Sequence, residues 1–405
     1  MNENKKFYNP KKPRIVLKKG KAKPFWNQNP WVFSGAIQEI RGGQPEDGDL
    51  VEVLDDKLNF IAKGYVSLNS SIRVRLITWQ LHHKIDKNFY RDKIKEALYY
   101  RNNTLLLRTK SSAFRLIHGE SDGIPGLIVD KYNDFLVAQF LTPGIERRKD
   151  TLLKILKEET RAEAIMERYS AGYRTKEGLP EIEYQIHDNA TPPTVIPIKE
   201  YDLPFEVDWQ RGQSTGFYLD QRENRLRLSK YANNKNVLDA FCYTGAFGIY
   251  MAVKGKAKHV TFIDNSNYVL EQAKNNAQLN KVQNATFQQL DLYKTQLPTD
   301  MQYDMIILDT PRLLQDQASV EQGKQELKQL YTNMANLLTK NGILAITERS
   351  NMLNWNDFLI IFNQAMQATD STFRIIETST AGPDYPLLPI CWEQTPLKMI
   401  IVAKI

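Results

Sequence analysis

The segment that most constrains the fold is 237–248, where a short apolar run leads through a glycine-containing turn into a helical pattern. Val237 and Leu238 are typical of a buried strand. Gly245 and Gly248 would let backbone N–H groups approach a ligand at the N-terminus of the helix that follows. The segment therefore predicts a nucleotide-cofactor cradle built on a parallel sheet.

Two further apolar runs place carboxylates at the same edge of this predicted sheet. The run 259–263 ends in Asp264, which follows Gly245 by 19 residues, where a ribose-binding carboxylate would lie. The run 304–308 ends in Asp309, within Asp-Thr-Pro-Arg. This last segment resembles motif IV of S-adenosylmethionine (SAM) methyltransferases. Only two of the three glycines of the dinucleotide pattern are present, so a dinucleotide cofactor is poorly supported.

Length and composition limit the class of protein. A chain of 405 residues with 42% apolar residues predicts two or three domains with ordinary cores. Two cysteines argue against a disulfide scaffold and fit a reducing compartment. No apolar stretch approaches the ~18 residues of a membrane span, and the start has no signal-peptide core. We expect a cytoplasmic protein with no membrane partner and no metal site.

The N-terminal arm is strongly basic. Residues 1–24 contain nine Lys or Arg and one acid, so the arm carries +8 of a chain total of +7 and the remainder is roughly neutral. Such an arm can contact RNA phosphates, and the candidates for RNA contact are Lys18, Lys19, Lys21 and Lys23, with Trp31 and Phe33. A solvated tail is the alternative.

The pattern of short elements predicts an α/β chain with a basic tail at 1–13 and three domains at 14–80, 81–190 and 191–405. The first is a small β-barrel with strands at 14–17, 49–54, 60–65 and 72–77. The second is an α+β unit with helices at 85–102 and 146–160, strands at 114–117 and 164–168, and a hairpin of 127–131 with 135–140. A linker at 188–193 and a hairpin within 196–209 precede a doubly wound, Rossmann-like parallel sheet with helices at 267–280, 321–339 and 355–368.

Six motifs in order resemble one family, the bacterial large-subunit rRNA cytosine-5 methyltransferases. They are Pro30–Ala36 (PWVFSGA), Gly119–Gly126 (GESDGIPG), Lys176–Gly178 (KEG), Thr215–Arg222 (TGFYLDQR), Phe241–Gly245 (FCYTG) and Asp309–Pro311 (DTP). The resemblance covers the chain from about Arg14 to its end. It implies an N-terminal PUA RNA-binding domain, a central α+β domain and a class I SAM-dependent methyltransferase domain acting on RNA.

The resemblance also implies which residues line the SAM pocket. Gly245 would lie beside the methionine end of SAM, and Asp239 would receive its ammonium group. Asp264 would accept both ribose hydroxyls, and Asp291 would take the adenine amino group. The full set of cofactor residues is Asp220, Gln221, Arg222, Asp239, Phe241, Tyr243, Thr244, Gly245, Asp264, Ser266, Asp291 and Asp309. For each acid, a helix cap or turn residue is the alternative.

The sequence also predicts the roles of two segments outside the cradle, 220–222 and 31–33. Asp220 to Arg222 could close over the cofactor, or Asp220 could cap a helix running to Tyr231 while Arg222 forms a surface ion pair. Trp31 and Phe33 alternate as in a half-buried strand, so we expect one in the core and at most one stacked on a base.

The catalytic end departs from the family. Methylation of cytosine C5 needs a cysteine thiolate that adds to C6, and Arg349 occupies that cysteine's position. Thr310 replaces the first proline of the usual Asp-Pro-Pro-Lys, which would loosen that loop, and Ser214 replaces a frequent lysine. Cys242 and Cys391 are the two possible substitute nucleophiles. The alternative for Cys242 is a packing role in the motif I turn. The alternative for Cys391 is an ordinary residue in the loop of a terminal hairpin.

Three functions follow as hypotheses. The first is a SAM-dependent RNA methyltransferase acting on rRNA, in which Asp309 and Pro311 form the acceptor site and a nitrogen or oxygen is methylated without a covalent adduct. The second is a catalytically inactive, SAM-binding ribosome-assembly factor in which Arg349 contacts phosphate. The third is a Rossmann dehydrogenase. The sequence leaves the oligomeric state open, with a homodimer as one possibility.

Overall fold

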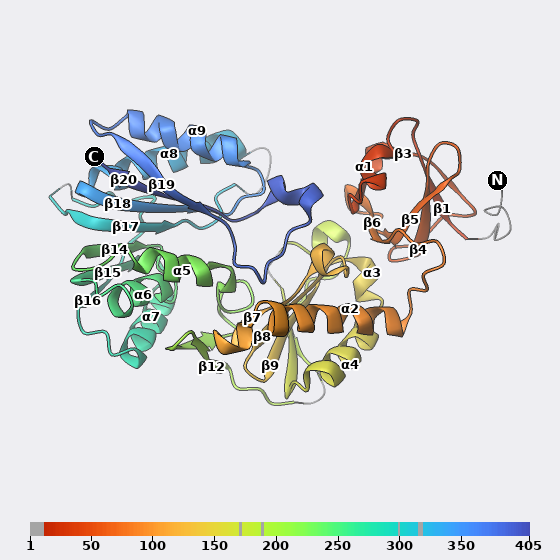
Figure 1. Cartoon of the computed structure of the whole chain (residues 1–405), viewed down its shortest axis with the longest axis horizontal. Helices are drawn as coiled ribbons and strands as arrows, with labels where there is room; N and C mark the ends of the chain where they lie inside the picture. Colours follow the sequence, from red (N-terminus) through yellow and green to blue (C-terminus); the bar gives the residue numbers. More distant parts are fainter. Residues whose placement is uncertain (1–11, 170–171, 188–189, 299, 315–318) are drawn as a thin grey trace. The chain divides into compact units, whose positions relative to one another are not determined.

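The computed structural model describes residues 12–169, 172–187, 190–298, 300–314 and 319–405, apart from the side chains of 392–394. Residues 188 and 189 of the predicted linker at 188–193 therefore lie outside the described residues. The basic tail through Lys11 lies wholly outside them. The chain divides into two compact units (Figure 1). The first comprises 1–196, 208–217 and 384–391, and the second comprises 197–207, 218–383 and 392–405.

The first unit begins with a six-stranded sheet in the order β2-β6-β5-β4-β1-β3. Its strands are β1 (Arg14–Leu17), β2 (Trp31–Phe33), β3 (Ile37–Arg41), β4 (Leu50–Leu54), β5 (Phe60–Val66) and β6 (Ile72–Thr78), with a short helix α1 (Lys23–Trp26). Strand β1 pairs with β4 in parallel and with β3 antiparallel. The four predicted strands are present, while β2 and β3 were not predicted.

Strand β2 corrects the expectation for its two aromatic residues. Val32, between them, is the fully buried residue, whereas Phe33 is 47% exposed and Trp31 is half-buried. The alternation of Trp31 and Phe33 thus marks the outward face of the strand, and neither ring belongs to the core. The Trp31 indole N–H instead donates to a Glu120 carboxylate oxygen at 3.0 Å.

The rest of the first unit is an α+β layer pair. Its sheet has the order β11-β10-β9-β8-β7, formed by β7 (Ala113–His118), β8 (Leu127–Tyr132), β9 (Phe135–Phe140), β10 (Ala164–Arg168) and β11 (Tyr184–Ile186). Its helices are α2 (Lys87–Tyr99), α3 (Pro143–Glu146) and α4 (Lys149–Thr160). The predicted hairpin is β8 with β9, which pair antiparallel. The Asp86 carboxylate caps α2 by accepting from the N–H groups of Asn88 and Phe89.

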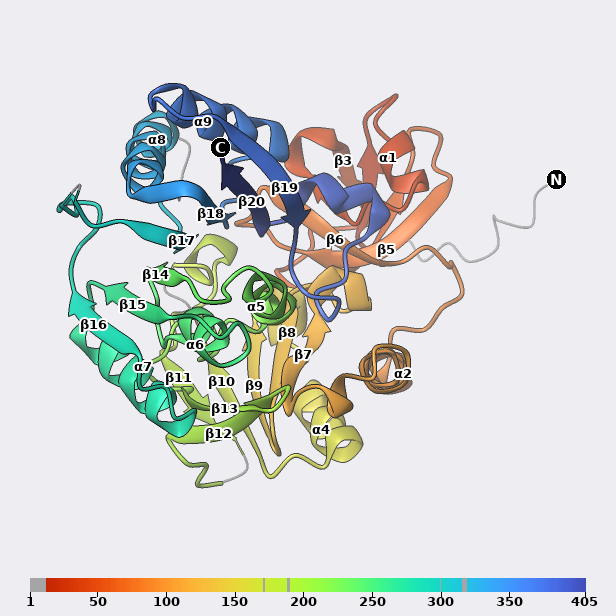
Figure 2. The same cartoon turned by 60° about the vertical axis from the view of Figure 1, so that its left-hand side comes forward.

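The second unit carries a seven-stranded sheet in the order β16-β15-β14-β17-β18-β20-β19 (Figure 2). Its strands are β14 (Asn236–Ala240), β15 (His259–Asp264), β16 (Ala285–Gln289), β17 (Tyr303–Asp309), β18 (Leu338–Glu348), β19 (Phe373–Ser379) and β20 (Lys398–Lys404). Five neighbouring strands of this sheet pair in parallel, as predicted: β16, β15, β14, β17 and β18. The last two form the predicted terminal hairpin, with β20 antiparallel to both neighbours.

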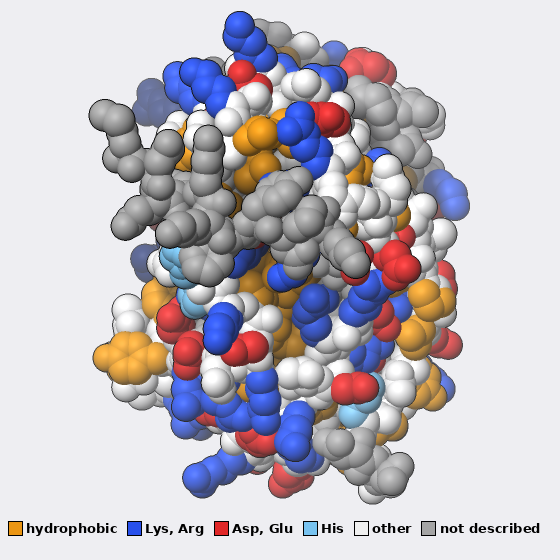
Figure 3. Space-filling model, turned by 90° about the vertical axis from the view of Figure 1, so that its right-hand side faces the viewer, with side chains coloured by type: hydrophobic (Ala, Val, Ile, Leu, Met, Phe, Trp, Pro, Cys, Tyr) orange, Lys and Arg blue, Asp and Glu red, His pale blue; other side chains and the backbone are white. Residues whose placement is uncertain are grey.

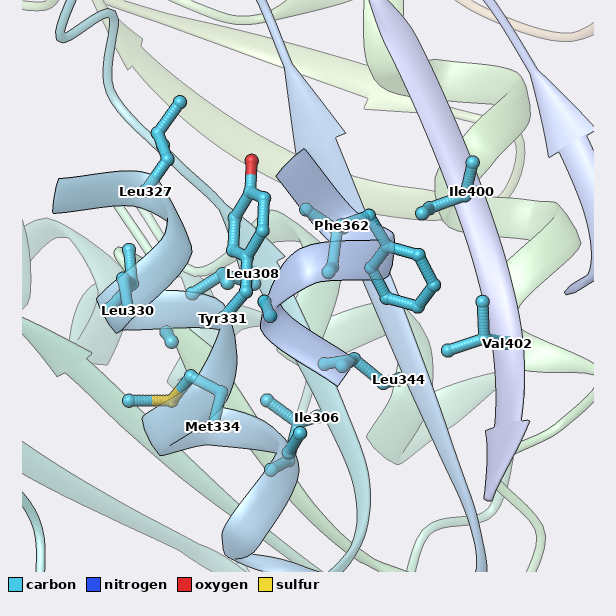
Figure 4. Packing of buried hydrophobic residues seen from close by; sticks show 14 of the residues in the cluster. Ile306, Leu308, Leu327, Leu330, Tyr331, Met334, Leu344, Phe362, Ile400 and Val402 are labelled. Carbon is cyan, nitrogen blue, oxygen red and sulfur yellow. The ribbon is translucent and has the colours of Figure 1, made fainter. Parts of the chain in front are cut away.

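Helices cover both faces of this sheet (Figures 1 and 2). One layer contains α5 (Arg222–Ser229), α6 (Ala246–Val253) and α7 (Asn267–Leu279), and the other contains α8 (Val320–Asn336) and α9 (Trp355–Gln367). Figure 4 shows the second layer packed on the sheet through Tyr331 and Phe362, against Ile306, Leu344 and Val402. A separate hairpin of β12 (Val195–Glu200) with β13 (Leu203–Asp208) matches the prediction for 196–209. Among the described residues, no helix combines the length and apolarity that crossing a bilayer requires.

Helix α6 packs tightly on the sheet at Gly248, and we predict that Gly248→Ala destabilises the protein. A Cβ there would lie 2.2 Å from Cε1 of Phe262 and 2.9 Å from Cγ1 of Val260, and the Phe262 ring is itself stacked on Phe287. Overpacking of this kind costs about 1–3 kcal/mol, measurable by urea unfolding. Gly35→Ala is the control, because a Cβ there meets nothing within 4 Å. Equal stabilities of the two variants would contradict this packing.

Candidate cofactor and acceptor site

The sheet of the second unit reverses its strand order between β14 and β17, and ligands of open parallel sheets bind at the carboxyl ends of strands beside such a point. Four predicted site residues lie at or just beyond these strand ends: Asp239 on β14, Asp264 on β15, Asp309 on β17 and Arg349 after β18. The chain order of the strands thus brings together residues that are far apart in sequence.

The turn after β14 has an unusual backbone. Phe241, Tyr243 and Gly245 have φ values of +58°, +50° and +78°, in the left-handed region that non-glycine residues rarely adopt. Such strain persists where surrounding contacts hold it and is concentrated at ligand sites. Here the Cys242 N–H donates to the Ile263 carbonyl at 2.9 Å, and the Gly245 N–H donates to the Cys242 carbonyl at 2.8 Å.

The sequence suggested that the two glycines of the cradle make room for a ligand. The structure gives a further reason for glycine at both positions. A Cβ on Gly245 would lie 3.0 Å from Cβ of Ala273 in α7, and the residue has positive φ. A Cβ on Gly248 would meet Phe262 of β15. Both glycines are therefore required by backbone conformation and helix packing within the protein, independently of any ligand.

Asp239 is fully buried at the base of the turn. Its Oδ2 accepts the Gly248 N–H at 2.7 Å, while its Oδ1 has no hydrogen-bond partner among the described residues. Burial raises the pKa of this carboxyl well above its usual range. Oγ1 of Thr244 in the same turn is also buried without a partner among the residues described. Unsatisfied buried polar atoms are rare in proteins, and these two fit a polar, cationic ligand such as the methionine end of SAM.

Asp264 is the last residue of β15, and Asp291 follows β16 by two residues. Asp264 accepts the N–H of Tyr243 through Oδ2 and the N–H of Ser266 through Oδ1, each at 3.1 Å, and burial raises its pKa. Each oxygen retains capacity for a ribose hydroxyl. Asp291 accepts the Tyr293 N–H at 3.1 Å and contacts Lys294, whose hydrogen bond to the carboxylate lowers the pKa of Asp291. These are turn contacts, so the adenine role of Asp291 remains a prediction.

Arg349 joins the acceptor end of the site. Its Nη1 donates to Oδ2 of Asp220 at 2.6 Å, and its Nε and Nη2 each reach an oxygen of Asp309 at 3.3 Å. Its guanidinium lies 4.2 Å from the ring centroid of Tyr218, and only 13% of its side chain is exposed. The two carboxylates raise its pKa despite the opposing effect of burial, so it is a fixed cation.

This geometry corrects the expectation that Arg349 is available for an RNA phosphate, because the guanidinium already has two carboxylate partners. It also corrects the expectation for Asp220. Helix α5 starts at Arg222 without a side-chain cap, and Asp220 pairs with Arg349 instead. Arg222 is fully buried rather than on the surface. Gln221 donates to Oδ1 of Asp309 at 3.1 Å, and closure of the 220–222 segment over the cofactor stays a prediction.

Thr310 and Thr347 tie the two neighbouring strand ends together. The Thr310 hydroxyl donates to the Thr347 carbonyl at 3.0 Å, and the Thr347 hydroxyl donates to Asp309. Threonine at 310 therefore anchors the loop, contrary to the expectation that it loosens it. Pro311 follows in the same loop. Ser214 belongs to the first unit.

Burial disfavours the thiolate form of both cysteines. Cys242 is buried, and burial raises the pKa of its thiol well above the usual range. Cys391 lies in the short 3₁₀ segment Pro389–Gln394 of the terminal hairpin, and burial raises its pKa as well. A raised pKa reduces the thiolate fraction on which cysteine reactivity depends.

The lysines predicted to contact RNA are all exposed beside β1 and α1: Lys18, Lys19, Lys21 and Lys23. The aromatic ring of Phe33 is exposed as well, and so is Trp26, which the sequence analysis missed. In Figure 3, Lys and Arg side chains are interspersed with Asp and Glu. The RNA role of these residues stays a prediction.

The strand order, the antiparallel β20 inserted between β18 and β19, and the carboxylates at the strand ends define a class I SAM-dependent methyltransferase domain. Models of a PUA-like domain and of a methyltransferase domain match residues 15–79 and 232–382. Ribosomal RNA large subunit methyltransferase I of Tolumonas auensis is 34% identical over 96% of this chain and 99% of its own. The Yersinia pseudotuberculosis protein of that name is 33% identical over 93% and 95%. The chain belongs to this family of large-subunit rRNA methyltransferases.

Solved structures share the fold. A SAM-dependent methyltransferase from Streptococcus mutans superposes with a TM-score of 0.81 at 17% identity, covering 96% of this chain and 99% of its own. A methyltransferase crystallised with S-adenosylhomocysteine gives a TM-score of 0.83 at 17% identity with the same coverage. The cofactor of this chain is SAM.

We predict that Arg349→Met destabilises the second unit and weakens methyl transfer, because it leaves Asp220 and Asp309 as largely buried, unpaired carboxylates. Removing one partner of a buried ion pair costs about 3 kcal/mol. Urea unfolding measures the loss. Arg374→Met is the control, because Arg374 is an exposed residue of β19 and its replacement should cost less than about 0.5 kcal/mol. Similar costs for the two variants would show that Arg349 is a surface-like charge.

We also predict that SAM affinity falls on the acid side at a pH above the ordinary aspartate pKa of about 3.9. Burial raises the pKa of Asp264, and only its ionised form accepts both ribose hydroxyls, so binding is lost as the pH falls through that raised pKa. Calorimetric titration across pH measures this. Asp264→Asn should bind SAM more weakly at neutral pH, with a smaller acid-side loss. An unchanged pH profile in the variant would assign the effect elsewhere.

Proposed function

We propose that this chain transfers the methyl group of SAM to a nucleophilic nitrogen or oxygen of large-subunit rRNA, without a covalent enzyme–RNA intermediate. The membership of the family supports the substrate class. The observation that carries the choice of acceptor is the fixed Arg349 cation at the position where the resemblance expects a cysteine.

Chemistry at cytosine C5 would require a nucleophile that adds to C6. Arginine cannot add to C6, and burial raises the thiol pKa of both Cys242 and Cys391. A nitrogen or oxygen acceptor has its own lone pair and needs only orientation and loss of its proton. SAM supplies an electrophilic methyl carbon when bound. Asp309 is held by Thr347, Gln221 and Arg349 and would orient the acceptor by accepting its hydrogen bond.

The cofactor end of the site has residues for each part of SAM. Asp239 and Thr244 would bind the methionine end, Asp264 the ribose, and Asp291 the adenine, with Phe241, Tyr243 and Ser266 in the adjoining turns. Phe241 packs against Tyr293 at 5.0 Å between ring centroids, which supplies an apolar wall near the adenine position.

The catalytically inactive alternative has no specific support. It was motivated by an Arg349 free to contact phosphate, and this guanidinium is bound by Asp220 and Asp309. We further propose a cytoplasmic location, where rRNA is available. The domain limits at 14–80, 81–190 and 191–405 and a homodimer are also proposals, and size-exclusion chromatography with light scattering tests the latter.

We predict that large-subunit rRNA from a deletion strain lacks one methyl group and that the purified protein restores it in the presence of SAM. Mass spectrometry of rRNA fragments identifies the nucleotide and the atom. Asp309→Ala should abolish restoration, while Asp370→Ala, which removes an exposed carboxylate of the same unit, should retain it. An unchanged rRNA methylation pattern in the deletion strain would refute the proposed substrate.

A separate prediction concerns the acceptor atom. RNA in which cytidines are replaced by 5-fluorocytidine should be released without a denaturant-stable protein–RNA complex, because no protein nucleophile adds to C6. A known cysteine-dependent C5 methyltransferase serves as the positive control. A stable complex in a denaturing gel would show covalent chemistry and overturn the choice of a nitrogen or oxygen acceptor.

A further inference from the structure

The first unit contains a cleft that the methyl-transfer site does not use. It has a volume of about 650 Å³ and is lined by Asn69, Ser70, Ser71, Arg75, Tyr173 and Lys176, among others. One wall is the turn between β5 and β6 with the start of β6, and the other is the segment 172–178. The cleft thus lies where the β-barrel meets the α+β layer, and its size suits a nucleotide-sized group.

Buried charge pairing holds the two walls together. Arg75 is buried at the floor, and its Nη1 and Nη2 donate to the two carboxylate oxygens of Glu177 at 3.0 and 2.7 Å. Arg75 also lies 3.7 Å from Glu120 and donates to the Ser67 hydroxyl at 3.2 Å. A bidentate, desolvated pair of this kind fixes geometry as well as charge. The cleft is therefore preformed rather than assembled by a ligand.

Gly178 provides a second constraint on the same walls. It has a φ of +74°, and a Cβ there would lie 2.1 Å from Nδ2 of Asn69. The structure gives each residue of the Lys176–Gly178 motif a role. Glu177 binds Arg75 of the opposite wall, and Gly178 leaves room for the Asn69 side chain. Lys176 lies at the rim of the cleft. The sequence motif marks the cleft, although Arg75 in β6 is 102 residues away from Glu177.

The rim carries the chemistry of a nucleic-acid contact. Tyr173 is 52% exposed, which presents an aromatic surface for base stacking. Lys176 is exposed, and because Arg75 and Glu177 compensate each other, the charged residues lining the cleft carry a net charge of +1. The hydroxyl of Ser71 and the amide of Asn69 add exposed hydrogen-bonding groups beside them.

We propose that this cleft binds a single-stranded segment of the RNA substrate, with one base stacked on Tyr173 and the adjoining phosphate at Lys176. The inference rests on the proposed function for its RNA partner, but it assigns a contact surface distinct from the SAM domain and from the N-terminal lysines. An unpaired base is favoured over a duplex because a stacked base must leave its helix to meet the ring.

The test is a binding titration of the full-length protein with a labelled single-stranded RNA oligonucleotide, with double-stranded RNA of the same sequence as the comparison. Tyr173→Ala should weaken single-strand binding by about tenfold or more, and Tyr173→Phe should retain it. Lys176→Glu should weaken binding and reduce the slope of log affinity against log salt by about 0.7 or more. The matched controls are Tyr99→Ala and Lys57→Glu, exposed residues of the same unit outside the cleft.

Retained affinity in both Tyr173→Ala and Lys176→Glu, or losses equal to those of the controls, would overturn the proposal, and so would wild-type preference for the duplex. Urea unfolding, which should be unchanged in all variants, reports that the first unit is folded, and calorimetric SAM binding reports the same for the second unit. The proposed function is tested separately by methylation of rRNA. If wild-type protein methylates rRNA while the cleft variants bind RNA normally, the cleft proposal alone fails. If RNA binding depends on the cleft but rRNA is never methylated, the proposed function alone fails.

Discussion

The acceptor end of this enzyme is organised by the ionic contact of one guanidinium with two carboxylates. Arg349, just after β18, binds Asp309 at the end of β17 and Asp220 in the segment before α5. Each of these loops would otherwise bring a poorly solvated charge to the edge of the sheet. Their mutual compensation fixes the loops against one another and leaves Asp309 with a defined orientation. Arg349 also stands at the position where the resemblance expects a nucleophilic cysteine. The arginine therefore adds the ionic contacts and removes the nucleophile at the same position.

Much of the scaffold follows from local sequence pattern. Strands β1 and β10 have the predicted limits, and β14, β15 and β17 lie where apolar runs predict them, because buried strands need continuous apolar residues. The placement of Asp239, Asp264 and Asp309 at one edge was also predictable, since successive parallel strands end on the same side of a sheet. Chain order alone is sufficient for that conclusion.

Side-chain partnerships across long separations were not predictable. The pattern of β2 offered two large aromatic residues, yet Val32 fills the core, because the pairing with β6 selects the face and residue size does not. Gly245 pointed to a ligand, whereas Ala273 and a left-handed backbone require it. The pairing of Arg75 with Glu177 joins β6 to the Lys176–Gly178 motif, and no local periodicity encodes such a contact.

The charge balance of the site explains why an arginine suits a methyltransferase that acts on RNA. Asp220, Asp239, Asp264 and Asp309 lie in one unit around the strand ends, and four carboxylates would favour the cationic cofactor but repel a polyanionic acceptor. Burial of Asp239 and Asp264 raises their pKa values, so their charged forms are disfavoured unless a cation such as the sulfonium cofactor lies beside them. Arg349 offsets one of the two negative charges of Asp220 and Asp309. Arg349 therefore lowers the negative charge at the acceptor end, which reduces the repulsion of a polyanionic nucleotide there.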